Sequence, residues 1–163
     1  MDSKRKKYKE IIRKNSSKYN LPSQLVYSII KVESDYQEYS IRYEKQFKWL
    51  YKPDRFVKGP ITLNTEENAQ KTSWGLMQLM GATARELGFD KLFLPELLKP
   101  EINIKYGCKY LAGLRERYKD LTNSIALFDD NMVAAYNAGS PRKKDNGEFV
   151  NQEYVDKILK NWS

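Results

Sequence analysis

The chain has 163 residues, 40% of them hydrophobic, which is the length and composition of one globular domain with its own core. It has no histidine and one cysteine, Cys108, which excludes Ser-His-Asp and Cys-His nucleophiles, a histidine-based zinc site and any disulfide within the chain. The net charge of +8 favours polyanionic partners such as nucleic acid, anionic lipid or acidic wall polymers, although dispersed charge is also typical of a solvated surface.

The amino terminus, residues 1–19, is predicted to form a basic helix that packs on the outside of the core through a thin apolar contact. Its basic start lacks the apolar run of a signal peptide, and no later stretch approaches membrane-spanning length. We therefore expect no stable membrane insertion.

The next predicted helix places an acid where a folded chain normally places an apolar side chain. At about 100° per residue, Glu33 points within roughly 60° of Val26, Ile29 and Ile30. An unpaired buried carboxylate raises its pKa, and a helix that ends after Ser34 acts in the same direction, so this acid suits general-acid chemistry. The alternative is that Glu33 lies at the solvent edge of the stripe or pairs with a basic residue.

The middle of the chain, residues 37–72, is predicted to be a small irregular or β-containing insertion. The aromatic segment 42–51 is expected to form a short helix that ends before Pro53, followed by a loop over 52–63 with a small hairpin as an option. Thr65, followed by two acids, is expected to cap a further short helix.

Residues 74–88 divide into two parts. The first part is rich in Gly and Met and contains Gln78, which suits a backbone and an amide close to a ligand better than a regular helix. For Gln78 the alternative is helix capping or satisfaction of a core polar group. The second part is a helix that Gly88 ends.

The carboxyl-terminal half is predicted to be helical. Residues 100–118 form the longest helix, with Cys108 as a small hydrophobe on its apolar face. Shorter helices follow over 122–127, 130–139 and 152–162. The whole chain, 1–163, is therefore predicted to be one mainly α domain with a small middle insertion.

Three pieces of this sequence together resemble the catalytic domain of lytic transglycosylases, lysozyme-like enzymes that cut the glycan strand of peptidoglycan. They are Val32-Glu33-Ser34, Gly75-Leu76-Met77-Gln78-Leu79-Met80 with a Thr-Ala helix after it, and Ala135-Tyr136-Asn137-Ala138-Gly139. Their order and spacing cover residues 21–158. The resemblance implies a lysozyme-like fold in which the insertion 37–72 forms part of the groove wall.

The resemblance makes Glu33 the single catalytic acid and base. It places eight residues at the substrate, with Ser34 also giving structural support: Ser34, Ser73, Gly75, Met77, Gln78, Met80, Tyr136 and Asn137. For Tyr136 the alternative is plain core packing. Many family members have a short segment before the Gly-Leu-Met-Gln motif, with a serine that contacts the acetamido group. Here the segment is long, and Ser73 and Thr72 are the candidates for that role.

Ordinary glycosidases need two carboxylates. In the transglycosylase scheme the substrate replaces the second one: its N-acetyl carbonyl assists, its C6 hydroxyl attacks C1, and a 1,6-anhydromuramoyl end results. The alternative is a goose-type-like muramidase that hydrolyses the same bond with water. This alternative requires a second acid facing Glu33, drawn from Glu38, Glu44, Asp54, Glu66 or Glu67.

Two other classes fit less well. A wall-binding module without catalysis does not explain Glu33, and a nucleic-acid binder does not explain an acid on an apolar stripe. We expect a peptidoglycan glycan strand as partner, no nucleic acid, no metal, no cofactor and a monomer. We also expect action at the cell wall, in the periplasm, outside the cell or on a virion, although no signal peptide is visible.

Overall fold

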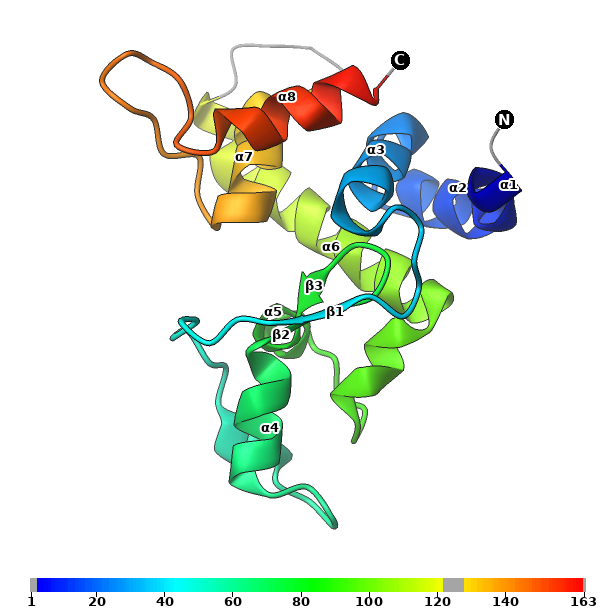
Figure 1. The fold of residues 1–163 in the computed structure, drawn as a ribbon, viewed down its shortest axis with the longest axis vertical. Helices are drawn as coiled ribbons and strands as arrows, with labels where there is room; N and C mark the ends of the chain where they lie inside the picture. Colours follow the sequence, from blue (N-terminus) through cyan, green and yellow to red (C-terminus); the bar gives the residue numbers. More distant parts are fainter. Residues whose placement is uncertain (1–2, 122–127, 163) are drawn as a thin grey trace. The chain divides into compact units, whose positions relative to one another are not determined.

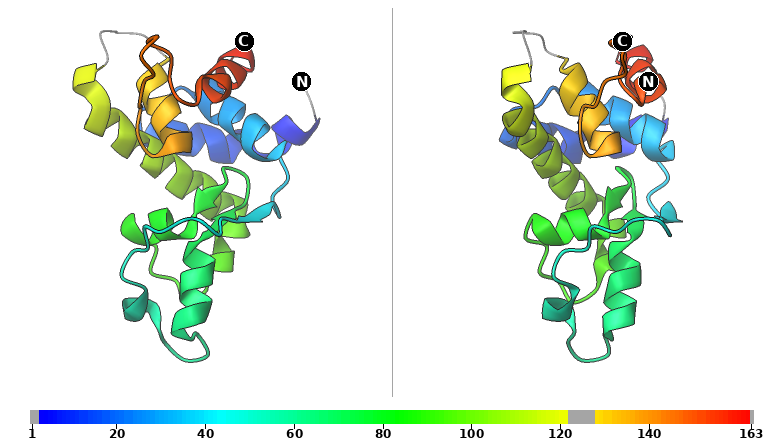
Figure 2. Two further views of the ribbon diagram at one scale, coloured as in Figure 1. Left: turned by 60° about the vertical axis from the view of Figure 1, so that its left-hand side comes forward. Right: turned by 90° about the vertical axis from the view of Figure 1, so that its left-hand side faces the viewer.

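The computed structural model describes residues 3–121 and 128–162, in two compact units (Figures 1 and 2). Unit 1 comprises the described residues up to Val32 and from Cys108 onward, and unit 2 comprises Glu33–Gly107. The helix predicted over 122–127 lies outside the described residues.

The described chain is mainly helical with a small sheet in its middle, which confirms the predicted fold class. Its α-helices are α1 Ser3–Lys7, α2 Lys9–Lys18, α3 Ser23–Ser34, α4 Leu63–Gln70, α5 Gly81–Glu86, α6 Pro100–Tyr118, α7 Asp130–Ala138 and α8 Gln152–Lys160. Its 3-10 helices are η1 Pro53–Phe56, η2 Leu94–Leu98 and η3 Lys119–Leu121. Its strands are β1 Ile41–Tyr43, β2 Thr72–Trp74 and β3 Leu79–Met80.

Unit 1 is a helical assembly held by an apolar core and a few long-range polar contacts. Helix α7 packs against α8, and the Ser28 hydroxyl of α3 donates to the carbonyl of Asn161 just after α8, at 2.8 Å. The Arg115 guanidinium of α6 donates to the carbonyl of Tyr19, at 3.1 Å, where α2 ends. The single basic helix predicted over 1–19 is divided at Tyr8 into α1 and α2.

Cys108 lies on the buried face of α6, as predicted for a small hydrophobe. Burial raises the pKa of its thiol from an ordinary 9.0 to about 12. The folded protein therefore holds this proton more tightly than the unfolded chain does. The contribution of this thiol to stability is complete below pH 9 and is lost as the pH rises toward 12.

We expect Cys108 to resist a thiol-specific disulfide reagent in the folded protein. At pH 8 a pKa of about 12 leaves a thiolate fraction roughly a thousandfold below that of the exposed thiol, and burial adds a steric barrier. Labelling followed by absorbance should be slow in buffer and rapid in denaturant. Equal rates in the two conditions would contradict the buried position.

Unit 2 is organised around a three-stranded antiparallel sheet in the order β1-β2-β3. Helix α4 packs against β2, α5, η1 and η2. The short helix predicted over 42–51 is wrong: its first residues form β1, which pairs with β2, and no helix follows before η1. The aromatic residues whose spacing suggested a helix also suit a strand, and the β-branched Ile41 directly before them favours one.

Two smaller expectations for unit 2 are also corrected. The strands lie at 41–43, 72–74 and 79–80, and the segment 52–63 contains η1 and no hairpin. Helix α4 begins earlier than predicted, with Thr62 as its cap: the Thr62 hydroxyl accepts a hydrogen bond from the backbone N–H of Thr65. Helix α5, by contrast, ends before Gly88 as predicted, and Gly88 has a φ of +91°.

A buried ion pair joins α4 to α5. Arg85, only 2% exposed, donates through its guanidinium to both carboxylate oxygens of Glu66, at 2.7 and 2.9 Å. It also donates to the carbonyls of Phe89 and Lys91, at 2.9 and 2.7 Å, and stacks on the Phe56 ring at 4.0 Å. Every charge in this pair is therefore compensated, which a buried ion pair needs if it is not to destabilise the fold.

We expect Arg85→Met to destabilise the protein by about 3–5 kcal/mol, because it leaves the Glu66 carboxylate buried without its cationic partner. Urea unfolding followed by circular dichroism measures this change. The double variant Arg85→Met/Glu66→Leu should recover much of the loss, since no buried charge remains. Lys119→Ala, which removes an exposed pair with Glu116, serves as a control without measurable effect. An Arg85→Met variant as stable as this control would contradict the role given to the pair.

Candidate active site

The candidate acid lies at the end of α3. This helix ends at Ser34, as predicted, and Glu33 is half-buried, one turn beyond the fully buried Ile29 and Ile30. The next two residues, Asp35 and Tyr36, both have a left-handed backbone, with φ of 48° and 62°. Non-glycine residues adopt this conformation at a cost, so the turn that follows the acid is a strained one.

The Gly-Leu-Met-Gln motif forms the turn between β2 and β3, and the end of α3 is attached to it. The buried Ser34 hydroxyl donates to the carbonyl of Leu76 at 2.8 Å. The turn itself begins at Gly75, with φ of +68°, and closes with a hydrogen bond from the Gln78 N–H to the Gly75 carbonyl at 3.1 Å. Ser34 therefore gives the structural support predicted for it.

Gln78 uses its side-chain amide nitrogen within the protein. This nitrogen donates to the carbonyls of Ser40 and Gly75, at 3.0 and 2.8 Å. The same Ser40 carbonyl accepts from the Gly75 N–H at 2.7 Å. These contacts match the alternative role, satisfaction of internal polar groups, and they fix the segment after α3 to the turn.

Asn103 of α6 is a central residue of this turn that sequence reasoning missed. Its side chain is fully buried; its oxygen accepts from the Met77 N–H at 2.8 Å, and its nitrogen donates to the carbonyls of Trp74 and Leu97 at 2.7 and 2.8 Å. A Cβ atom on Gly75 would lie 2.6 Å from this nitrogen, so Gly75 leaves the space that Asn103 occupies. The available signal was a lone amide directly before the first buried apolar residue of this helix, Ile104.

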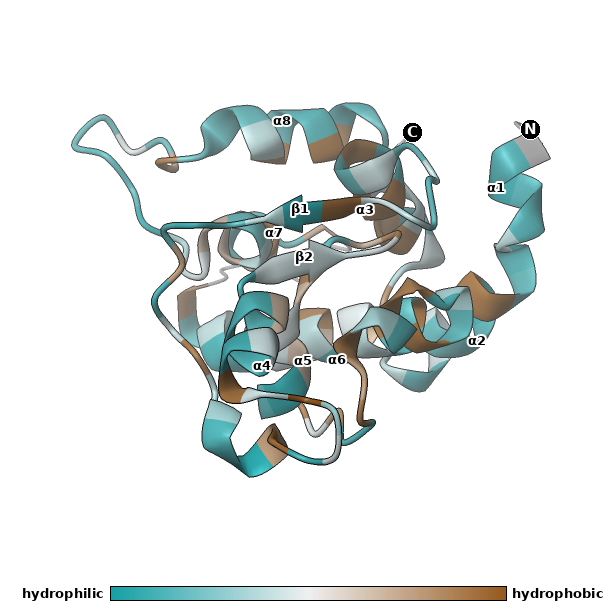
Figure 3. Cartoon of the chain, turned by 60° about the horizontal axis from the view of Figure 1, so that its bottom comes forward, coloured by the Kyte–Doolittle hydropathy of each residue, from teal (hydrophilic) through white to brown (hydrophobic). Residues whose placement is uncertain are grey.

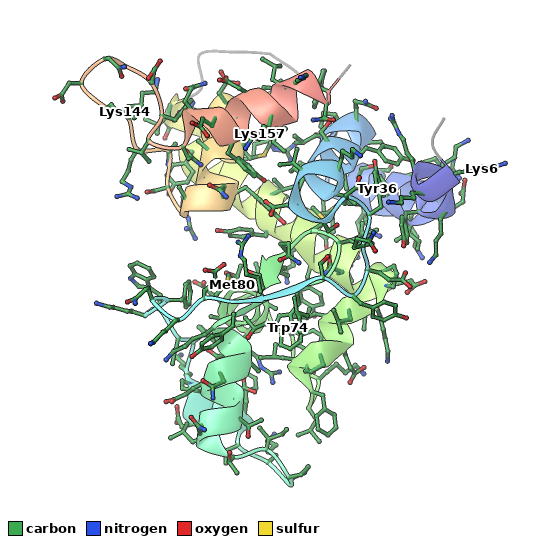
Figure 4. All side chains as sticks on the ribbon, viewed as in Figure 1. Lys6, Tyr36, Trp74, Met80, Lys144 and Lys157 are labelled. Carbon is green, nitrogen blue, oxygen red and sulfur yellow. The ribbon has the colours of Figure 1, made fainter. Side chains whose placement is uncertain are left out.

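The other motif residues of unit 2 also make contacts within the protein. Ser73 is buried, and its hydroxyl lies 3.1 Å from the sulfur of Met80 on the neighbouring strand β3. Met77 is buried against α6, where a Cβ atom on Gly107 would lie 2.3 Å from its sulfur. Figure 4 shows Met80, which is half-buried, close to β2.

Tyr136 and Asn137 belong to unit 1, on helix α7, which ends at Gly139 as predicted. Tyr136 is buried, with its ring centroid 5.4 Å from that of Tyr110, so the alternative of core packing describes its surroundings. Asn137 is exposed, and its side-chain oxygen accepts from the Asn151 amide at 3.0 Å.

The candidates for a second catalytic carboxylate lie in or near the insertion, and in the structure two of them form ion pairs. Glu66 is buried in the ion pair with Arg85, and Glu44 is paired with Arg42. Asp54 is exposed in η1. Among the residues described, no group of three or more His, Cys, Asp or Glu side chains is arranged to hold a metal ion.

Comparisons with known proteins identify the family to which the chain belongs. The transglycosylase SLT domain family matches residues 10–158, and the chain belongs to this family. The chain is 26% identical over 135 residues to the membrane-bound lytic murein transglycosylase C of Haemophilus ducreyi (strain 35000HP / ATCC 700724), a match that covers 83% of this chain and 31% of that relative. No solved structure matches the chain significantly. In the described part of the chain, no helix combines the length and apolar character needed to cross a membrane.

We expect Asn103→Ala to destabilise the protein by about 2–4 kcal/mol, because the Met77 N–H and two carbonyls lose their buried partner. Thermal unfolding measures this loss. Asn103→Asp is the informative comparison: its carboxylate still accepts from Met77 but cannot donate to Trp74 and Leu97, so it should not restore stability. Wild-type stability in Asn103→Ala would contradict the structural role given to the three hydrogen bonds of Asn103.

Proposed function

We propose that the chain is a peptidoglycan lytic transglycosylase that cleaves the MurNAc-GlcNAc β-1,4 glycosidic bond and leaves 1,6-anhydroMurNAc ends. One observation carries the proposal: Glu33, at the end of α3, is attached through Ser34 to the turn that holds the Gly-Leu-Met-Gln motif. The family match and the name of the relative support the same activity.

In the proposed mechanism Glu33 acts first as an acid and then as a base. It donates its proton to the glycosidic oxygen as the bond to C1 of the muramoyl residue breaks, while the N-acetyl carbonyl of that residue stabilises C1. The C6 hydroxyl then attacks C1 and gives its proton to the Glu33 carboxylate, which restores the acid. An internal nucleophile can be worth several kcal/mol in effective molarity, so no activated water is needed.

The occupied acids of the insertion support a single-carboxylate mechanism. Hydrolysis would need a second carboxylate free to activate water. Glu66 is committed to Arg85, and Glu44 to Arg42, which leaves fewer candidates for that role than the sequence offers. The muramidase activity is therefore the outcome against which the proposal is tested.

The remaining assignments come from the motifs. We propose that Tyr136, Asn137 and the Met80 side chain contact the sugar, and that the insertion 37–72 contributes to the wall of the groove. The proposed partner is the peptidoglycan strand, met at the cell wall by a monomeric enzyme without metal or cofactor.

Digestion of purified peptidoglycan followed by mass spectrometry tests the reaction. We expect muropeptides lighter by one water than the hydrolytic products, because the C6 oxygen replaces water as nucleophile. Glu33→Gln should fold with an unchanged melting temperature and lose nearly all cleavage, since an amide cannot donate the proton.

The control is Glu101→Gln, an exposed acid in the first turn of α6, which should cleave like the wild type. Products with reducing ends would show that the chain hydrolyses the bond and is not a transglycosylase. Substantial cleavage by Glu33→Gln would remove Glu33 from the role of catalytic acid.

A further inference from the structure

The small sheet of unit 2 has two faces with different contents. In the antiparallel register, Ile41 lies opposite Trp74 and Tyr43 lies opposite Thr72, so these four side chains share one face. Arg42, Ser73 and Met80 are paired across the same strands and lie on the other face. The face of Ile41 and Tyr43 is therefore separate from the one that carries Ser73.

A cavity of about 410 Å³ opens beside this face, within unit 2. Thr72 and Trp74 of β2 line it, together with Asn68 of α4 and the segment 92–95 before and in η2. The lining is mainly apolar; its polar residues are Thr65, Asn68 and Thr72, together with Glu66, whose carboxylate is paired with Arg85. A cavity of this size and composition is typical of small-ligand sites and holds about one sugar residue.

Two large apolar side chains are exposed along the edge of this face. Ile41 is 62% exposed and Tyr43 52% exposed, and the Tyr43 hydroxyl donates to the Asn68 side chain at 3.3 Å, which joins the edge to the cavity lining. Figure 3 shows β1, partly hydrophobic, next to β2 and α4. Adjacent apolar side chains on an exposed surface often mark an interaction site.

The loop after β1, residues 44–51, extends this surface and is fixed at both ends. The Glu44 N–H donates to the Lys71 carbonyl at 2.8 Å, and the Tyr51 N–H donates to the Gln70 side chain at 2.7 Å. Gln70 in turn donates to Glu66, the partner of Arg85, at 3.0 Å. The buried ion pair therefore holds the loop in place.

An aromatic side chain projects from this fixed loop. Trp49 is 77% exposed and rests edge-on against Phe47, with ring centroids 5.6 Å apart. Ring stacking by a preorganised side chain costs little conformational entropy. Trp49 thus presents a ready flat surface to a ligand.

The charge of the segment 39–52 favours an acidic ligand. Its single acid, Glu44, is paired with Arg42, whereas Lys45, Lys48 and Lys52 are exposed. The lining of the cavity contains no lysine or arginine, and its one acid, Glu66, is neutralised by the ion pair with Arg85, so the positive charge of the segment lies around the cavity and not in it. A ligand that combines neutral sugar rings with nearby carboxylates fits this distribution better than a phosphate backbone does.

We infer that the Ile41–Tyr43 face, the cavity beside it and the loop 44–51 form a second peptidoglycan-binding surface, which holds the polymer outside the residues that cleave it. Sugar rings stack on Trp49 and Tyr43, an acetamido group enters the cavity, and peptide-stem carboxylates face the lysines. This inference rests on the proposed function for its choice of ligand. It assigns to the long insertion a role in retaining the polymer.

Binding to purified, insoluble peptidoglycan tests the inference, with Glu33→Gln as the background so that no strand is cut. We expect the added pair Tyr43→Ala/Trp49→Ala to weaken binding about tenfold or more, as loss of central aromatic contacts does at other interfaces. Asn68→Trp, which places a bulky ring at the cavity on the exposed surface of α4, should weaken binding similarly. Leu159→Ala, an exposed apolar residue of α8, is the matched control and should bind like the background.

Three outcomes would overturn the inference: unchanged binding by both test variants, equal Trp49-dependent binding to DNA, or self-association through this face in sedimentation. Cleavage by the wild-type chain, measured on the same material, separates the two proposals. Wild-type cleavage with unchanged binding by the variants refutes only the second surface. Variant-sensitive binding without wild-type cleavage refutes only the enzymatic function.

Discussion

The buried side chain of Asn103 is the constraint on which the candidate site depends. One amide satisfies the Met77 N–H and two carbonyls, groups that would otherwise be buried without partners at a cost of about 1–3 kcal/mol each. Within the turn shaped in this way, the Leu76 carbonyl accepts a hydrogen bond from the Ser34 hydroxyl. A residue of α6 thus determines where the end of α3, and with it Glu33, is attached.

The insertion is built into unit 2 in a similar way. Glu66 and Arg85 join α4 to α5, and Gln70 extends this contact to the loop that carries Trp49. An acid that composition alone offers as a catalytic candidate is therefore structural. The same ion pair removes a competitor of Glu33 and supports an aromatic loop, so the mechanism and the proposed second surface share one structural cause.

Local patterns in the sequence predicted much of the fold. Helical periodicity and the glycines at positions 88 and 139 predicted α5, α6 and α7, and the Gly- and Met-rich composition of the motif predicted that residues 75–78 are not a regular helix. The strand β1 was missed because its partner strand, β2, is distant in the sequence. The roles of Asn103 and Arg85 were missed for the same reason, since their partners are 26 and 19 residues away.

The two left-handed residues after α3 limit how the family scaffold can vary here. Asp35 and Tyr36 form a corner of fixed length, closed by the Gln37 N–H to the Ser34 carbonyl at 2.9 Å. An extra residue within α3 would turn Glu33 by about 100° around the helix axis. The hydrogen-bonded corner follows Glu33 and does not reverse this rotation. A change of length in the segment 37–72, which follows this corner, leaves the direction of Glu33 on α3 unchanged.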